Sequence, residues 1–229
     1  MIDITTTATI RPDIFRTTLS TFCNKLFTDK SQYRLIINID PIGDDKDPIE
    51  IIDIAKEFFT NILVNIPQKP NFAQAVKWCW ERTTSEFVFH LEDDWKLRKN
   101  IDINHLISIM NQYKNMVGLR LSKSRVKNFS AKEKNDSFIE SRKVVLNPIF
   151  LRGEFVRDIA QKMDIINNPE RQIRTTFGLT EDKIVGIYCG VGEGRYVRHI
   201  GSDWQKVSKW DKIKGSNFIT WDLRENING

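Results

Sequence analysis

The chain has 229 residues and a net charge of +5; 40% of its residues are hydrophobic, 28% are charged, and the mean hydropathy is −0.40. These values are typical of a globular domain and exclude a disordered chain or a fibre, and the length predicts a single domain over residues 1–229. No apolar stretch approaches the roughly 18 residues of a membrane span, so we expect no integral membrane association.

Residues 1–95 alternate between short apolar runs and amphipathic segments. The apolar runs predict strands at residues 2–10, 33–40, 62–66 and 87–91, and helical spacing predicts helices from Pro12 and at 49–59 and 72–82. This alternation predicts an α/β fold with a mixed, mainly parallel sheet flanked by helices. Ligands of such sheets bind at the carboxyl ends of the strands.

Residues 96–229 are less regular. We expect helices at 103–113 and 154–163, strands at 116–121 and 196–200, and a polar loop at 125–137. A strand at 144–151 would be bent or at an edge because it contains Pro148. Thr180 is expected to cap a helix that starts with Glu181 and Asp182.

Positive charge is unevenly distributed along the chain. Residues 120–143 hold eight basic and three acidic side chains, and residues 195–214 hold six and two. Such clusters favour an anionic ligand, either nucleotide phosphates or nucleic acid. A solvated surface is the alternative interpretation.

The N-terminus and the cysteines predict a cytoplasmic protein. The first residues lack the basic region and apolar core of a signal peptide. Cys23, Cys79 and Cys189 are far apart and form neither a CxxC pair nor a zinc-binding pattern, so we expect reduced, structural thiols.

Three adjacent carboxylates, Glu92, Asp93 and Asp94, follow the predicted strand at 87–91. They repel one another and need a counter-charge. A divalent cation supplies it and can also clamp a diphosphate. An acidic loop that caps the next helix is the alternative.

Residues 71–94 resemble the GT-A family of nucleotide-sugar glycosyltransferases. In that family a helix precedes a strand that ends in a DxD-type motif. Here the helix follows Asn71, and the triplet 92–94 matches the motif with Glu in the first place. The resemblance covers residues 3–95 well and 140–205 loosely. It implies a GT-A fold with a nucleotide-sugar-binding half at 1–95 and an acceptor-binding, catalytic half at 96–229.

The resemblance also implies the ligands and their residues. The donor would be a nucleoside-diphosphate sugar, with UDP expected, and the cofactor Mn²⁺ or Mg²⁺. Asp94 and a late histidine, His199, would hold the metal, imidazole being a reasonable ligand for Mn²⁺; a structural histidine is the alternative. The donor-binding residues that the resemblance implies are Thr9, Arg11, Asp40, Asn71, Glu92 and Asp93.

Glu181–Asp182 resembles the ED motif of inverting GT-A enzymes. The acceptor hydroxyl must lose a proton as it attacks the anomeric carbon. The resemblance therefore implies inversion, with Asp182 as the general base and Glu181 in contact with the acceptor. Ordinary acidic residues of a first helical turn are the alternative.

Further residues are expected around the donor and the acceptor. Arg198, Lys206 and Lys209 would neutralise the leaving diphosphate. Residues 202–214 would form a flap over the nucleotide, a solvated tail being the alternative. Trp95 would stack on a sugar ring, core packing being the alternative. The residues expected to bind the acceptor are Trp95, Arg120, Lys123 and Arg125.

The acceptor and the reaction class have alternatives. We expect a carbohydrate acceptor; a hydroxymethylated base in viral DNA, flipped out of its duplex in the host cytoplasm, is the second candidate. A metal-dependent nuclease or phosphotransferase would use the triplet and Asp182 for two metals. A nucleic-acid-binding module without activity is disfavoured, because the carboxylates would repel phosphates unless a metal were present.

Overall fold

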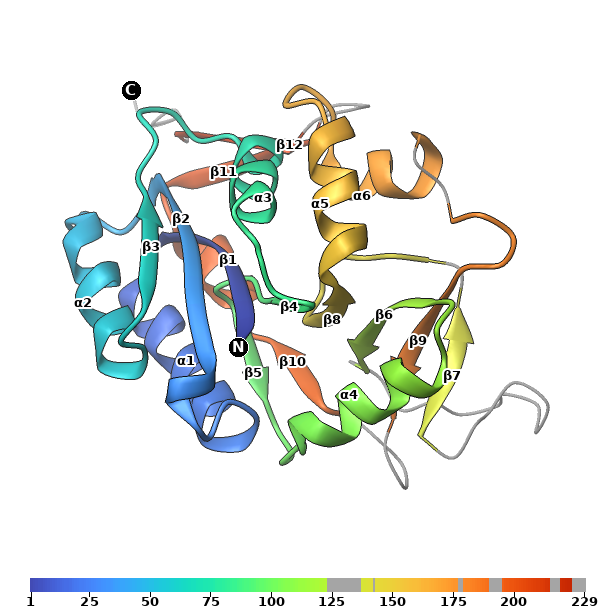
Figure 1. The fold of residues 1–229 in the computed structure, drawn as a ribbon. Helices are drawn as coiled ribbons and strands as arrows, with labels where there is room; N and C mark the ends of the chain where they lie inside the picture. Colours follow the sequence, from blue (N-terminus) through green and yellow to red (C-terminus); the bar gives the residue numbers. More distant parts are fainter. Residues whose placement is uncertain (123–136, 142, 177–178, 190–194, 215–218, 224–229) are drawn as a thin grey trace.

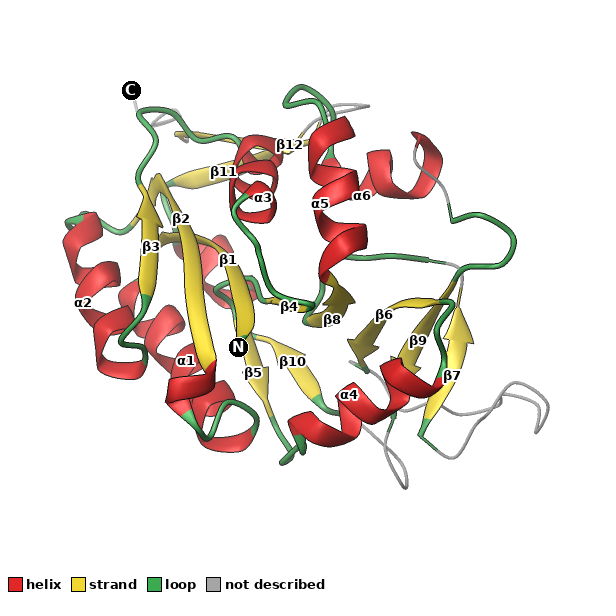
Figure 2. Ribbon diagram, in the orientation of Figure 1, coloured by secondary structure: helices red, strands yellow, loops and turns green. Residues whose placement is uncertain are grey.

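An eight-stranded sheet crosses the molecule, with helices on both of its faces (Figures 1 and 2). The computed structural model describes residues 1–122, 137–141, 143–176, 179–189, 195–214 and 219–223. The strands are β1 Ile2–Ile10, β2 Tyr33–Gly43, β3 Ile62–Asn65, β4 Phe87–His90, β5 Trp95–Leu97, β6 Met116–Leu121, β7 Phe138–Ser141, β8 Ile149–Arg152, β9 Ile184–Tyr188, β10 Val197–His199, β11 Trp210–Lys214 and β12 Ile219–Leu223. The α-helices are α1 Pro12–Lys25, α2 Pro48–Phe58, α3 Phe72–Glu81, α4 Ile103–Gln112, α5 Gly153–Lys162, α6 Pro169–Arg171 and α7 Ser202–Val207.

The main sheet has the strand order β3-β2-β1-β4-β8-β6-β9-β7. The pairs β2–β3, β1–β2, β1–β4 and β6–β9 are parallel, and β4–β8, β6–β8 and β7–β9 are antiparallel. The predicted mixed, mainly parallel sheet flanked by helices is confirmed. Strand β8 is antiparallel to both β4 and β6, so β4 and β6 run in the same direction. The carboxyl ends of β1, β2, β4, β6 and β9 therefore all lie at one edge of the sheet.

Each face of the sheet has its own core. Alternate residues of β1, including Ile4, pack with Phe15 and Leu19 of α1 on one face. On the other face, Val88 of β4 packs with Trp80 of α3 and with α5. The central strands are buried on both faces, which explains why they read as continuous apolar runs.

Local signals place the starts of the first helices where the sequence predicts them. Pro12 and Pro48 stand in the first turns of α1 and α2, where a missing N–H costs nothing. The Asp47 side chain accepts from the Ile49 N–H at the start of α2, and the Asn71 side chain accepts from the Gln74 N–H at the start of α3.

Two predicted elements are wrong. The strand expected at 144–151 begins only at Ile149, because Pro148 cannot donate to a ladder. The helix expected from Glu181 is a turn, closed by the Lys183 N–H on Thr180 O, and then β9. The β-branched run of β9 gains two ladder partners, β6 and β7, which outweigh the local cap signal. Of the polar loop expected at 125–137, residues 125–136 lie outside the described part of the chain.

The chain after β9 returns to the carboxyl edge of the sheet. Strand β10 pairs with β5, directly after the triplet 92–94. Helix α7 and the hairpin β11–β12 follow, and Trp210 Nε1 donates to Gly43 O at the end of β2 (2.8 Å). Two segments that are 167 residues apart in the sequence at this contact therefore build the same edge (Figure 1).

Candidate functional site

A pocket opens at the carboxyl ends of β1, β2 and β4. The residues that line it are Thr7, Ala8, Thr9, Arg11, Asp40, Phe72, Glu92, Asp93, Asp94 and Trp221. Six of them, from three strand ends, are residues that the sequence singles out for donor or metal binding. The parallel sheet brings them together because the carboxyl ends of its strands meet at one edge.

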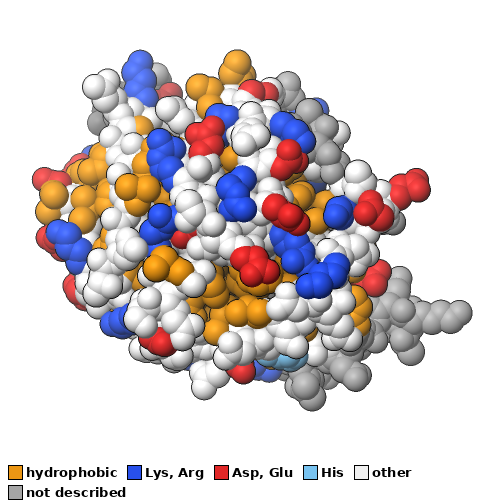
Figure 3. Space-filling view, in the orientation of Figure 1, with side chains coloured by type: hydrophobic (Ala, Val, Ile, Leu, Met, Phe, Trp, Pro, Cys, Tyr) orange, Lys and Arg blue, Asp and Glu red, His pale blue; other side chains and the backbone are white. Residues whose placement is uncertain are grey.

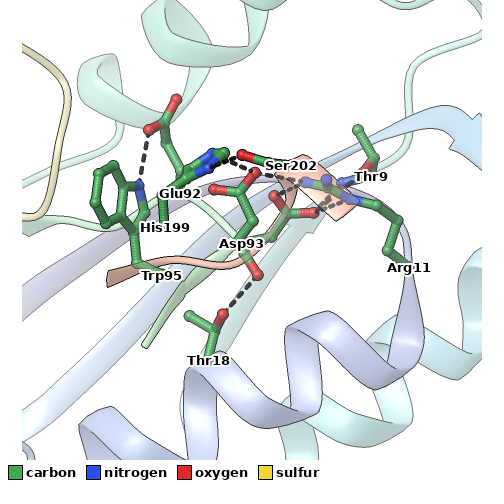
Figure 4. Close-up of polar contacts among 9 residues, drawn as sticks. Thr9, Arg11, Thr18, Glu92, Asp93, Trp95, His199 and Ser202 are labelled. Atoms are coloured by element: carbon green, nitrogen blue, oxygen red, sulfur yellow. Dashed lines mark hydrogen bonds and ion pairs between the residues drawn. The ribbon is translucent and has the colours of Figure 1, made fainter. Parts of the chain in front are cut away.

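Asp93 is fully engaged by the protein itself. Its Oδ2 accepts from the Thr9 backbone N–H (2.9 Å), the Thr9 hydroxyl (3.1 Å) and Arg11 Nε (3.3 Å), and its Oδ1 accepts from Arg11 Nη2. The Thr18 hydroxyl of α1 donates to the Asp93 carbonyl (2.7 Å; Figure 4). Asp93 is 3% exposed, so it orients Arg11 and the loop after β1 rather than offering free lone pairs to a ligand.

Asp94 pairs with His199. Asp94 Oδ2 lies 3.1 Å from His199 Nε2 and 3.3 Å from Arg11 Nη2. His199 Nδ1 contacts the Ser202 hydroxyl at 3.0 Å, which fixes the orientation of the imidazole ring (Figure 4). Burial opposes the charge of Asp94, but His199 and Arg11 outweigh it and lower the pKa of the carboxyl. The structure thus brings together the two residues that the resemblance implies as metal ligands.

The Asp94–His199 pair fits a divalent ion. Two adjacent ligands of a six-coordinate Mn²⁺ or Mg²⁺, each about 2.1 Å from the metal, are separated by about the observed Oδ2–Nε2 distance. The described residues hold no group of three or more His, Cys, Asp or Glu side chains that could bind a metal. Such an ion would therefore need further ligands, such as water or a bound substrate, beside this pair.

Gly201 allows the close approach of the two segments. A Cβ at this position would lie 2.2 Å from Asp94 Oδ2 and 2.9 Å from Arg11 Nη1. The neighbouring Ile200 N–H donates to the Asp94 carbonyl (2.8 Å). The backbone after β10 is thereby held directly against the acidic motif.

Arg11 also contacts the C-terminal segment. Its guanidinium lies 5.0 Å from the centre of the Trp204 ring in α7, and Trp204 Nε1 donates to Asp44 Oδ1 (2.8 Å). Trp204 in turn contacts Trp221, which lines the pocket. Residues 202–214, expected to form a flap, thus lie beside the pocket.

Asp40 lies at the pocket with uncharged hydrogen-bond donors. The Asn38 side-chain amide donates to its Oδ1 (2.8 Å), and the Asn71 backbone N–H donates to the carboxyl as well. Burial raises the pKa of Asp40 to about 6 against these two donors, and the nearby Asp93 charge adds to the rise. The Asp40 carboxyl can therefore accept a hydrogen bond from a ligand that enters the pocket.

Glu92 and Trp95 are held on the other side of the cluster from Arg11 (Figure 4). Trp95 is 3% exposed, its Nε1 donates to Glu92 Oε2 (3.0 Å), and its ring lies edge-on to His199 at 5.1 Å. The prediction that Trp95 stacks on a sugar is wrong, because its faces are buried. Trp95 instead orients one pocket carboxylate and one imidazole.

The structure does not bring Glu181 and Asp182 to the pocket. They precede β9, whose first residue, Ile184, pairs with Met116 at the start of β6, and Asn115 Nδ2 donates to Asp182 O. The carboxyl end of β9 is the end that faces the pocket edge, and a five-residue strand is about 17 Å long. Asp182 is thus at the opposite edge of the sheet, and its hydrogen bond with Thr180 lowers its pKa. Its prediction as the base is wrong.

Other predicted donor contacts have partners within the protein. The Asn71 side chain caps α3 and donates to Ile165 O (3.0 Å). Lys206 pairs with Asp203, and Lys209 pairs with Asp45. Alternation along β10 points Arg198 to the face opposite His199. Binding of the donor by Asn71, and of its diphosphate by Arg198, Lys206 and Lys209, stays a prediction.

Of the predicted acceptor cations, Arg120 is described, and Lys123 and Arg125 lie outside the described residues. In the sheet register, Arg120 of β6 pairs with Ile149 of β8, and Ile149 pairs with His90 at the end of β4. Two strand spacings, about 10 Å, therefore separate Arg120 from the end of β4 along the pocket edge. Burial lowers the pKa of Arg120, and its Nε has no hydrogen-bond partner among the described residues. Over the face that carries α3 and α5, basic and acidic side chains are interspersed (Figure 3).

The arrangement disfavours a two-metal nuclease. Such a site needs several carboxylates around two ions about 4 Å apart. Here Asp93 is occupied by Arg11, and Asp182 is at the far edge. Of the four carboxylates in that hypothesis, Asp94, paired with His199, and Glu92, bonded to the Trp95 indole, remain at the pocket.

Sequence inspection missed several residues that line the pocket or contact its lining residues. Asn38 is a polar residue inside the apolar run 33–40, and this is the signal that could have revealed it. Trp204 and Trp221 carry no local signal, because only the return of the chain places them at this edge. The helices of the described part of the chain include none with the length and hydrophobicity of a membrane span.

No protein-family model and no curated protein sequence matches the chain. Solved structures do. The structure of S. aureus TarS matches with a TM-score of 0.57 and 11% identity, over 90% of this chain and 38% of that one. TarS 1–349 in complex with UDP-GlcNAc matches with a TM-score of 0.55 and 14% identity, over 90% of this chain and 64% of that one.

TarS 1–349 in complex with UDP matches with a TM-score of 0.54 and 12% identity, over 86% of this chain and 60% of that one. This chain thus spans less than two thirds of each of these structures. At such low identity the likeness establishes a shared fold.

Proposed function

We propose that the chain is a metal-dependent glycosyltransferase that moves a sugar from a UDP-sugar to a hydroxyl of a carbohydrate acceptor. The Asp94–His199 pair carries the proposal, because Asp94 lines the same pocket as Asp40. The fold that the chain shares with TarS supports it, and the UDP and UDP-GlcNAc complexes of TarS indicate which donors to test first.

The protein's own residues would divide the work between the two ends of the donor. Asp40, with the aromatic surfaces of Phe72 and Trp221, would hold the nucleoside. Asp94 Oδ2 and His199 Nε2 would hold Mn²⁺ or Mg²⁺. The bound ion supplies positive charge that stabilises the departing diphosphate. Arg11 would fix the direction of the Asp94 carboxylate.

An inverting displacement needs a base for the acceptor hydroxyl. Asp93 is held by Arg11 and Thr9, Asp94 faces His199, and Asp182 is at the opposite edge of the sheet. We assign the base to Glu92, which lines the pocket and is oriented by the Trp95 indole.

Calorimetric titration of UDP tests the proposal, with Mn²⁺ and with chelator, on the wild type, Asp94→Asn and His199→Ala. We expect wild-type binding with metal, and a loss of at least about tenfold with chelator or in either variant, since one ligand-to-metal contact is worth well over 1.4 kcal/mol. Asp53→Asn, which removes an exposed carboxylate on α2, should bind like the wild type.

Release of UDP from UDP-GlcNAc in the same samples extends the test from binding to chemistry. Two outcomes would overturn the proposal. One is a folded wild type that binds no nucleotide with metal present. The other is binding that is equally tight with chelator and in Asp94→Asn.

A further inference from the structure

A short row of hydrogen bonds leads from the edge strand β3 to the pocket. Asn65 at the end of β3 is the register partner of Asn38 in β2. Asn65 Nδ2 donates to Asn38 Oδ1 (2.6 Å), and Asn38 Nδ2 donates to Asp40 Oδ1 (2.8 Å). Asn38 is 1% exposed and Asp40 is 7% exposed.

The chemistry of the carboxylate sets the direction of this row. An ionised Asp40 only accepts hydrogen bonds, so Asn38 must turn its NH₂ toward Asp40. The carbonyl oxygen of Asn38 then faces β3, where only a donor can satisfy it. The NH₂ of Asn65 is that donor. Asn65 therefore decides the orientation of Asn38, and Asn38 supports the ionised form of Asp40.

The surroundings of Asp40 otherwise oppose its charge. Burial raises its pKa, and so does the Asp93 carboxylate from β4, which is itself paired with Arg11 from the loop after β1. The Asn71 N–H at the start of α3 adds one further donor. With Asn38 and Asn71 on the carboxyl, the acceptor positions that remain are the ones a pocket ligand can use.

On the basis of the proposed function, in which Asp40 holds the nucleoside of the UDP donor, we propose that Asn65 and Asn38 are positioning residues that keep the Asp40 carboxyl turned toward the imide N–H of uracil as a hydrogen-bond acceptor. Phe72 and Trp221 line the same pocket and offer aromatic surfaces to a planar base. A ribose hydroxyl is the other donor that Asp40 could accept from, and the experiment separates the two.

The test compares UDP with N3-methyl-UDP, which lacks the imide N–H but keeps the ribose and the diphosphate. Titrations at fixed Mg²⁺ would cover pH 5–8 for the wild type, Asn65→Leu and Asn38→Asp. Asn61→Leu, an exposed asparagine just before β3, is the matched control. Circular dichroism checks that each variant folds; Asn65 is only half-buried, so its variant keeps the test decisive if Asn38→Asp does not fold.

We expect the wild type to bind N3-methyl-UDP at least about tenfold more weakly than UDP, because a buried acceptor is left unpaired. In Asn65→Leu this ratio should fall below about threefold, and the acid midpoint of UDP binding should rise by about half a pH unit. Asn61→Leu should keep both wild-type values. A merely structural role of Asn65 would weaken both ligands equally and leave the ratio unchanged.

Two results would overturn this inference while leaving the proposed function intact. In the first, the wild type binds UDP and N3-methyl-UDP equally, which assigns Asp40 to the ribose. In the second, the Asn65→Leu ratio equals that of the wild type. A wild type that binds neither ligand would instead overturn the proposed function itself.

Discussion

Three carboxylates in the pocket differ in the side chains that pair with them. Asp93 is saturated by Arg11 and Thr9, and Asp94 is shared between Arg11 and His199. The donors that Asp40 has among the described residues, Asn38 and Asn71, are uncharged, which explains why burial raises its pKa to about 6. The free energy that this costs the fold is expected where a ligand, rather than the protein, completes the hydrogen bonding.

Asp40→Asn should stabilise the folded protein at neutral pH. The unfolded carboxyl ionises near 3.8 and the folded one near 6, so above pH 6 the native state bears the full cost of the charge, up to about 3 kcal/mol. The gain should fall to about half at pH 5 and vanish below pH 4, where both states are protonated. Urea unfolding at pH 7.5 and 5 measures it, with Asp53→Asn as the control. A variant no more stable than the wild type at pH 7.5 would contradict the expectation.

At the scale of elements, α7 and β11 are held beside the pocket through contacts that are mostly polar or aromatic. Trp204 covers the Arg11 guanidinium and donates to Asp44, and Trp210 donates to Gly43. Val207 is 84% exposed, and α7 contains no buried residue. Elements with so little buried apolar surface open at a lower free energy than the core.

Trp204→Ala should therefore loosen residues 202–214 without unfolding the sheet. Losing the cation–π contact and the bond to Asp44 costs on the order of 1–2 kcal/mol. Trypsin cleavage at Lys206 and Lys209 should accelerate about five- to thirtyfold, because cleavage follows the population of the open form. Trp204→Phe, which keeps a ring over Arg11, should give a smaller increase. Equal cleavage rates in all three proteins would exclude this role for Trp204.

At the scale of the whole molecule, one buried carboxylate ties the centre of the sheet together. Asp3 in β1 accepts from Arg34 Nε of β2 (2.8 Å) and from the Thr84 and Ser85 N–H groups before β4 (2.7 and 2.9 Å). Burial opposes its charge, but these donors outweigh burial and lower its pKa. Asp3 therefore holds three neighbouring strands at the amino edge, opposite the pocket.

Asp3→Asn should destabilise the protein by about 3 kcal/mol at pH 7, because Arg34 loses its buried partner. A lowered pKa stabilises the fold above the unfolded value of 3.8, and this contribution is lost as the pH falls through the folded pKa. The difference from the wild type should thus be largest near neutrality and shrink below pH 4. Thermal unfolding across pH 3–7 measures it. Asp29→Asn, at an exposed turn, should have a small effect, and a similar loss in both variants would contradict the role of Asp3.

Whether a sequence prediction is confirmed depends on how far apart in the chain the interacting residues lie. Periodicity and capping are local, and they predict β1 to β4 with their helices to within a few residues. The pairing of Asp94 with His199 is long-range, and the family resemblance rather than the residue pattern pointed to it. The Trp95 prediction fails because burial is a property of the packed core and not of the neighbouring triplet.

By itself, the sequence determined the alternating strands and helices, the acidic motif at a strand end, and Asp40 at another, because each depends on residues close together in the chain. Only the tertiary structure decided what these residues face. The antiparallel β8 between β4 and β6 sets the direction of β9 and sends Asp182 to the far edge. The return of the chain after β10 brings His199, Gly201 and Trp204 to the pocket. Strand direction and chain return depend on the free energy of the whole sheet, which no local pattern records.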